Sequence, residues 1–249
     1  MTATMIRTAL LASLLAAVRV AASPLGDAVR AGDANTVKSL VANAGAANAL
    51  DEHQDAPLHW AAHSGSVEMV ALLLSLGGDV NVRNGYAATP LHIASERGRV
   101  EVVKQLLAGG ANVNSENKFQ ATPLYFATFE GRDDVVKLLL ERGATVDARN
   151  VSKATALHIA AEQGRIGAAR LLLEKGADVG ARNQQLATPL HIAVEHGRVD
   201  AIKLLLSKGA DPTAVNASGK SARDLASANP DLSKLLGAAA AAGGGKAKH

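Results

Sequence analysis

The sequence contains no cysteine among its 249 residues. A disulfide framework, a thiolate metal site and a cysteine nucleophile are therefore excluded. Aromatic residues are also scarce, at 2% of the chain. Because hydrophobic residues nevertheless make up 48%, the core has to be built from alanine, leucine, valine and isoleucine, which favours closely packed helices.

A basic stripe that could hold nucleic acid is missing as well, although the formal net charge is +3. Residues 23–236 hold 22 of the 26 Lys and Arg residues and all 23 Asp and Glu residues, so their net charge is −1. The basic excess lies at the two ends, in Arg7, Arg19, Lys246 and Lys248. Since nucleic-acid binding needs a concentrated basic patch, we expect no nucleic-acid partner.

The first 22 residues contain no acid and include a mostly apolar stretch from Thr8 to Val18, followed by the small residues Val20 and Ala22. This composition is typical of a signal peptide, and an amphipathic extension or organelle leader is the alternative. A membrane-spanning helix needs about 20 residues, so we expect no membrane span. The protein is exported, secreted or periplasmic, if residues 1–22 are a cleaved signal, and cytoplasmic otherwise.

One four-residue pattern, Thr-Pro-Leu-His in its fullest form, recurs every 33 residues. Its copies begin at Ala56, Thr89, Thr122, Thr155 and Thr188, and extrapolation reaches Ser23 backward and Ser221 forward. Threonine followed by proline is typical of a helix start, with the side chain three residues later placed as in a capping box. A glycine nine residues after each start predicts the end of a short helix. A second helix then carries Val and Leu at helical spacing and ends at another glycine.

The period and the signature together resemble the ankyrin repeat family. The resemblance implies an all-α ankyrin-repeat solenoid of helix-turn-helix units joined by β-hairpin-like fingers. We expect an N-terminal capping unit at 23–55, internal units at 56–88, 89–121, 122–154, 155–187 and 188–220, a C-terminal capping unit at 221–236, and a disordered tail of Ala, Gly and Lys at 237–249.

The fingers depart from the family pattern at their tips. Asparagine recurs where aspartate is common, at Asn84, Asn117, Asn150, Asn183 and Asn216. Only Gly219 keeps the glycine that the family has three residues later. Because asparagine can also close an Asx turn and accepts a left-handed backbone, we expect the fingers to form.

Histidine is the residue type that could suggest metal binding. His59, His92, His158 and His191 occupy one position of successive units, where each is expected to cap its own helix. His59 and His63 have the spacing of two metal ligands on a helix, but no third ligand is evident. We therefore expect no metal, no cofactor and no catalytic residue. A metal-binding protein or enzyme that uses the histidine-bearing face is the alternative to a non-catalytic binding module.

All six aromatic residues lie between Trp60 and Phe129. Trp60 and Phe126 stand where other units have isoleucine, so we expect both in the core, and Tyr125 replaces a capping histidine. The repeat requires no apolar residue at Tyr86, Phe119 and Phe129.

The resemblance implies that recognition takes place on the concave face of the first helices and on the finger tips. We hypothesise that a protein partner docks on the inner face between Tyr86 and Glu130, with Tyr86, Phe119 and Phe129 as anchors. The polar positions of this site are His63, Glu96, Arg97 and Glu130. The alternative is that the three rings only cover their neighbours. We expect the protein to act as a monomeric scaffold or adaptor.

Overall fold

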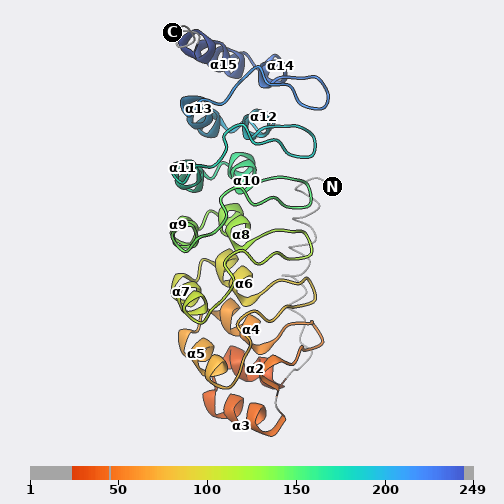
Figure 1. The fold of residues 1–249 in the computed structure, drawn as a ribbon, viewed down its shortest axis with the longest axis vertical. Coiled ribbons are helices and arrows are strands. Elements are labelled where there is room, and N and C mark those ends of the chain that lie inside the picture. Colours follow the sequence, from red (N-terminus) through yellow and green to blue (C-terminus); the bar gives the residue numbers. More distant parts are fainter. Residues whose placement is uncertain (1–23, 45, 244–249) are drawn as a thin grey trace. The chain divides into compact units, whose positions relative to one another are not determined.

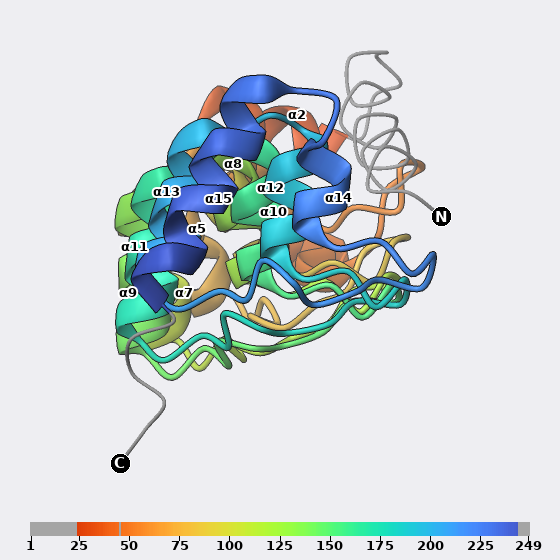
Figure 2. The ribbon, with the colours of Figure 1, turned by 90° about the horizontal axis from the view of Figure 1, so that it is seen from above.

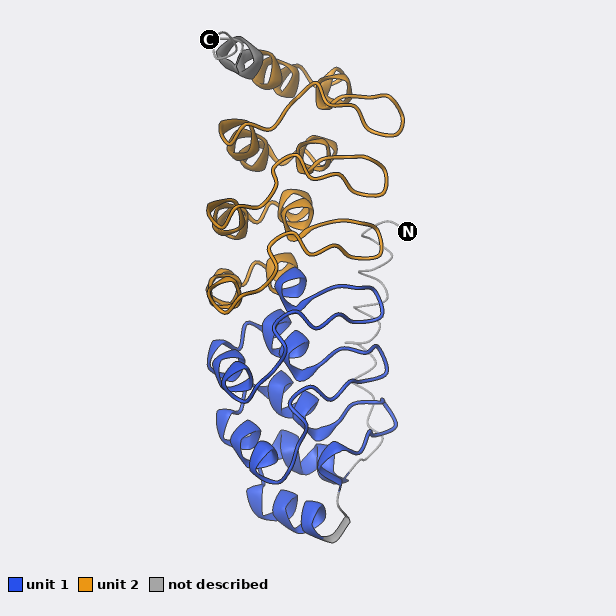
Figure 3. Cartoon of the chain, viewed as in Figure 1, with its two compact units in different colours: residues 1–126 blue, residues 127–249 orange. Residues whose placement is uncertain are grey.

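The computed structural model describes residues 24–44 and 46–243, so the expected leader at 1–22 lies outside the described residues. Within the described part, the chain forms fourteen α-helices, one 3₁₀ helix and no strand; an isolated β-bridge joins Val215 and Ser221. The chain divides into two compact units, unit 1 at residues 1–126 and unit 2 at residues 127–249 (Figure 3). The boundary runs within helix α8 (Pro123–Glu130).

The helices of unit 1 form two rows, with the first row between the second row and the fingers (Figure 1). The first row contains α2 (Pro24–Ala31), α4 (Pro57–Ser64), α6 (Pro90–Arg97) and the start of α8; the second contains α3 (Ala34–Ala44), α5 (Val67–Ser75) and α7 (Val100–Ala108), and the 3₁₀ helix η1 covers Ala46–Asn48. Ala61 and Ala94 are fully buried in the first row. Their small side chains let consecutive helices pack closely.

Unit 2 repeats this arrangement, and its two rows are seen end-on in Figure 2. The first row contains the end of α8, α10 (Ala156–Gln163), α12 (Pro189–Glu195) and α14 (Ala222–Ala226); the second contains α9 (Asp133–Glu141), α11 (Ile166–Glu174), α13 (Val199–Ser207) and α15 (Pro230–Gly243). Ala160 and Ala193 are fully buried between first-row helices, as are Leu157 and Leu190.

The helix boundaries are those that the repeat predicts. Thr89 is extended, with ψ 165°, and Pro90 begins α6, where its missing N–H has no helical partner to lose. Gly98 ends the same helix with φ 69°, in the left-handed region. Second-row helices end in the same way, at glycines such as Gly77 and Gly110 with φ 85° and 90°.

The five fingers that contain the recurring asparagine are closed by it. The Asn84 Oδ1 accepts hydrogen bonds from the N–H groups of Tyr86 and Ala88, both at 3.0 Å, and the Asn84 N–H donates to the Ala88 carbonyl. The other four finger asparagines make the same two side-chain bonds. Asparagine therefore closes the turn as expected. The glycine position still has positive φ in the fingers that lack glycine, as at Ala87.

A disordered tail was expected from residue 237 onward; in the structure, helix α15 continues to Gly243. The helix is held to its unit by Leu232 and Leu236, which are buried, and it packs against α14 and α13. Alanine has the highest helix propensity of any residue type. The alanine run that follows therefore extends a helix that is already anchored. Residues 244–249 lie outside the described part of the chain.

Candidate partner-binding site

The four recurring histidines use both ring nitrogens. In unit 1, the His92 Nδ1 accepts a hydrogen bond from the Thr89 N–H at 3.0 Å, and Nε2 lies 3.1 Å from the Ala121 carbonyl oxygen in the next finger. Because an N–H group can only donate, Nδ1 carries the lone pair and Nε2 carries the proton. Each ring thus caps its own helix, as predicted, and also binds the following finger, which was not predicted.

His59 makes the same pair of contacts in unit 1, and His158 and His191 make them in unit 2. Burial lowers the pKa of His92 and of His158 to about 4, and it lowers the pKa of His59 as well. A ring in this state has no lone pair left for a metal ion. No group of three potential metal-ligating side chains exists among the described residues.

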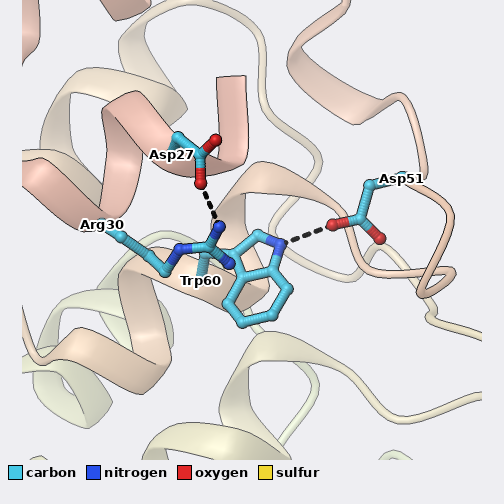
Figure 4. A network of polar contacts seen from close by, with 4 residues as sticks. All are labelled: Asp27, Arg30, Asp51 and Trp60. Carbon is cyan, nitrogen blue, oxygen red and sulfur yellow. Dashed lines mark hydrogen bonds and ion pairs between the residues drawn. The ribbon is translucent and has the colours of Figure 1, made fainter. Parts of the chain in front are cut away.

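Trp60 lies in the core of unit 1, as predicted, with 5% of its surface exposed. Its Nε1–H donates to the Asp51 carboxylate at 2.8 Å, and the Arg30 guanidinium lies 4.5 Å from the ring centroid (Figure 4). Arg30 also pairs with Asp27. The indole therefore joins helix α2 to the first finger, a structural task that needs no ligand.

Phe126 is also buried, as predicted, with 4% exposure, and its ring makes a T-shaped contact with the His92 ring at a centroid distance of 5.6 Å. Tyr125 is buried at the position of a capping histidine. Its N–H donates to the Thr122 Oγ1 at 3.4 Å.

Tyr86 and Phe119 occupy equivalent positions on adjacent finger tips of unit 1, two residues after the closing asparagine. Tyr86 is 39% exposed, whereas Phe119 is half-buried. The Lys118 N–H donates to the Tyr86 carbonyl at 2.9 Å, so the two tips are held against each other. The structure thus brings these two predicted site residues together.

The predicted polar residues of unit 1 lie on the last turns of first-row helices. His63 belongs to α4, and Glu96 and Arg97 belong to α6; all three are half-buried. Burial lowers the pKa of His63, and the positive charges of Arg97, Arg99 and Arg30 lower it further. The Arg97 Nε is buried and has no hydrogen-bond partner among the described residues.

The remaining two predicted residues belong to unit 2. Phe129 and Glu130 form the end of α8, and both are half-buried. The Phe129 carbonyl accepts a hydrogen bond from the Arg165 Nε at 3.1 Å. The Phe129 backbone therefore takes part in the contact between consecutive repeats, independently of its side chain.

A family model decides the identity of this architecture. The model, described as ankyrin repeats (3 copies), matches residues 7–84, 76–150 and 145–216. The chain belongs to the ankyrin repeat family. A solved structure, the ankyrin repeat domain of human ASB11, is 32% identical and superposes with a TM-score of 0.78, covering 88% of this chain and 98% of that one. Comparison with curated proteins found no significant match. The predicted all-α ankyrin fold class is confirmed.

One recurring residue of the ankyrin units was missed in the sequence. Arg99 directly precedes the second helix of its repeat, and its Nε donates to the His63 carbonyl near the end of the first helix of the preceding repeat, at 3.4 Å. Arg165 and Arg198 make the equivalent bond in unit 2. A cation at a helix C-terminus is favoured by the helix dipole. The signal was present as a Gly-Arg pair repeated every 33 residues from Gly98 onward.

A small hollow lies at the N-terminal end of the ankyrin stack in unit 1. It has a volume of about 190 Å³ and is lined mainly by apolar atoms, with Leu25, Leu50 and Trp60 among the contributors. Asp51 and Asp55 also line it, and Asp51 already accepts the Trp60 Nε1–H.

No helix in the described ranges is long and apolar enough to cross a bilayer.

Proposed function

We propose that this ankyrin repeat protein is a non-catalytic, monomeric binding module whose partner is another protein. Ankyrin repeats generally act in protein–protein interaction. The contacts proposed in unit 1 are Tyr86 and Phe119 as anchors, with His63, Glu96 and Arg97 on the concave face. Phe129 and Glu130 of unit 2 are proposed to contact the same partner.

The exposure of Tyr86 beside Phe119 is the observation that carries this proposal. Aromatic rings are usually buried, yet Tyr86 lies at the exposed tip of one finger. Phe119 lies at the equivalent position of the next finger. Their tips are joined by a backbone hydrogen bond, so the backbone positions that carry both rings are fixed before a partner arrives. Preorganised aromatic residues are common binding hot spots because little side-chain entropy is lost on association.

The chemistry of the other residues supports a binding role over catalysis. The recurring histidines are buried and hydrogen-bonded at both ring nitrogens, so they are unavailable as ligands or proton donors to a substrate. The near-balanced charge of residues 23–236 supports a protein partner over a nucleic acid.

Two alanine substitutions in unit 1 test the proposal. The double variant Tyr86→Ala, Phe119→Ala should weaken the affinity for the partner by about 30-fold per ring removed, because removal of a hot-spot ring costs about 2 kcal/mol. Quantitative affinity capture with mass spectrometry, comparing the wild-type and variant chains, measures the change. The matched control is Leu50→Ala, which removes an equally exposed apolar side chain from the same unit.

Circular dichroism and thermal unfolding should show that the double variant keeps its helices. If this folded variant recovers the same proteins in the same amounts as the wild type, the site is wrong. Separate variants Phe129→Ala and Glu130→Ala assign or remove the contribution of unit 2.

A further inference from the structure

The tips of three successive fingers in unit 2 carry cations and exposed aliphatic side chains. These tips are residues 149–153, 182–186 and 215–219, and together they contain three cations and no acid. Their exposed side chains define what we call the fingertip surface: Arg149, Val151, Lys153, Arg182, Leu186 and Val215. The aliphatic members are 40%, 47% and 47% exposed, in the order Val151, Leu186 and Val215.

The three fingers lie side by side in unit 2 (Figure 1), and backbone hydrogen bonds join their tips. The Gln184 N–H donates to the Ser152 carbonyl at 2.9 Å, and the Ala217 N–H donates to the Gln185 carbonyl at 2.8 Å. An arginine side chain also joins two neighbouring fingers, because Arg149 donates to the Arg182 carbonyl at 2.8 Å. The backbones of neighbouring tips, which carry the cations and aliphatic groups, are therefore held at fixed spacing.

The positive charge of this surface is largely available. Arg182 donates one N–H to the Val215 carbonyl at 3.2 Å, which leaves most of the donors of its guanidinium unused. None of the three cations forms an ion pair with an acid of the described residues. The acids of these fingers are bound to backbone N–H groups instead, as Asp147 is to Asp178 and Asp211 is to Thr213.

Leu186 lowers the stability of the folded protein in two independent ways. Its side chain is 47% exposed, and its backbone has φ 54°, in the left-handed region that disfavours residues with a bulky side chain. The equivalent residue of the next finger is Gly219, with φ 70°, which has neither cost. The other fingers without glycine share this backbone, so the feature particular to Leu186 is its exposed aliphatic side chain, which a partner would shield from water.

We propose that the fingertip surface of unit 2 binds an extended acidic segment of a protein. Carboxylates of the segment pair with Arg149, Arg182 and Lys153, and its aliphatic side chains cover Leu186 and the two valines. Arginine forks match carboxylates well, and complementary charge speeds association. A single-stranded nucleic acid fits less well, because its bases need aromatic side chains for stacking and these three fingers have none.

This surface shares no residue with the site proposed in unit 1. The two proposals can therefore fail separately. The experiment uses the full-length chain and a fluorescein-labelled peptide that carries Glu and Leu in a Gly/Ser background. A second peptide has Ser in place of Leu, a third has Lys in place of Glu, and a single-stranded oligonucleotide of equal charge is the fourth probe. Fluorescence anisotropy at low and at physiological salt measures binding.

The Glu/Leu peptide should bind, and the Lys peptide should not. The variants Arg182→Ala and Leu186→Asn should each weaken the Glu/Leu peptide by about tenfold. Asparagine tolerates the left-handed backbone, so Leu186→Asn should unfold at the same temperature as the wild type or higher, which separates lost binding from lost folding. The matched controls are Lys137→Ala and Lys203→Ala, which remove exposed cations from helices α9 and α13 of the same unit.

Several outcomes would overturn the inference. The first is that the wild type does not bind the Glu/Leu peptide. The second is that the controls weaken binding as much as Arg182→Ala does. The third is that the oligonucleotide or the Ser peptide binds equally well, which would indicate general attraction for polyanions. Finally, if Tyr86→Ala with Phe119→Ala abolishes peptide binding while Leu186→Asn does not, the peptide belongs to the unit 1 site, and only the fingertip inference is lost.

Discussion

Two buried hydroxyl groups occupy a repeat position that other ankyrin units fill with apolar side chains. Ser95 and Thr128 are fully buried, and neither side-chain oxygen has a hydrogen-bond partner among the described residues. The equivalent residues one repeat earlier and two repeats later than Ser95 are Ala62 and Ala161, both buried. A buried hydroxyl without a partner loses its bonds to water and gains nothing in return.

We expect Ser95→Ala to raise the free energy of unfolding by about 1 kcal/mol, since it removes the unsatisfied oxygen and adds the better helix former. Urea unfolding measures the change, with an unchanged slope against urea concentration. Ser64→Ala is the control, because the Ser64 hydroxyl already donates to the Ala61 carbonyl and no gain is expected. A Ser95→Ala variant less stable than the wild type would contradict the interpretation.

Single residues also show how far sequence reasoning reaches. The burial of Trp60 and Phe126 followed from their repeat position, because the period aligns each with the isoleucines that other units have in the core. The second hydrogen bond of His92 did not follow, since its acceptor lies 29 residues further along, in the next finger. Spacing along the chain identifies a cap within one helix, whereas a contact between repeats depends on how they pack.

At the scale of the finger, the left-handed residue is the feature that sets local strain. Ala87, Gln120, Lys153 and Leu186 all have φ between 54° and 57°, although only glycine adopts this region without penalty. The side-chain bonds of the preceding asparagine impose the conformation, so the finger forms at some cost in stability. The family pattern showed that glycine was missing but not whether the backbone would change to accommodate its replacement.

Exchanging the residues at two equivalent tips tests this account. Gln120→Gly should stabilise the protein by about 0.5 to 1 kcal/mol, because relief of the left-handed penalty exceeds the added entropy of the unfolded chain. Gly219→Gln should destabilise it by a similar amount, since Gly219 has φ 70°. Thermal unfolding of both variants measures the two shifts. Shifts of the same sign would show that backbone conformation does not control stability at these tips.

The last helix shows how packing can extend a helix beyond the part that a local pattern predicts. An Ala and Gly run has no amphipathic period, so the sequence favoured disorder from residue 237 onward. Leu232 and Leu236 nevertheless anchor α15 against its unit, and the following alanines extend the helix to Gly243. Nucleating a helix costs more than extending one, and packing of the first turns supplies the nucleus. The outcome depended on tertiary contacts that the composition of the tail does not contain.

At the scale of the whole molecule, the buried histidines couple stability to pH. His92 in unit 1 and His158 in unit 2 have a pKa of about 4, below the ordinary histidine value of 6.5. Between these values the unfolded chain takes up protons that the folded chain refuses, so stability falls as pH falls from about 6.5 toward 4. Each ring that gains a proton would place an Nδ1–H against the backbone N–H that it now accepts from.

From these shifts we expect the free energy of unfolding to drop by about 2 kcal/mol per histidine between pH 7 and pH 5, or about 4 kcal/mol for the pair. Urea unfolding at a series of pH values measures the drop. Carboxylates such as Asp33, Asp211 and Asp224 have a lowered pKa, so their contribution is lost only below about pH 4 and does not enter this window.

The variants His92→Gln and His158→Gln separate this linkage from any general effect of acid. Each should be less stable than the wild type at pH 7, because the ring that links two consecutive repeats is gone, and each should show a drop between pH 7 and pH 5 that is smaller by about 2 kcal/mol. Exposed His196, which pairs with Glu162 at 3.9 Å, is the control position, and His196→Gln should leave the buried-histidine contribution in place. If both core variants keep the full pH dependence of the wild type, the neutral rings are not its source, and the hydrogen bonds from one repeat to the next stabilise the protein without sensing protons.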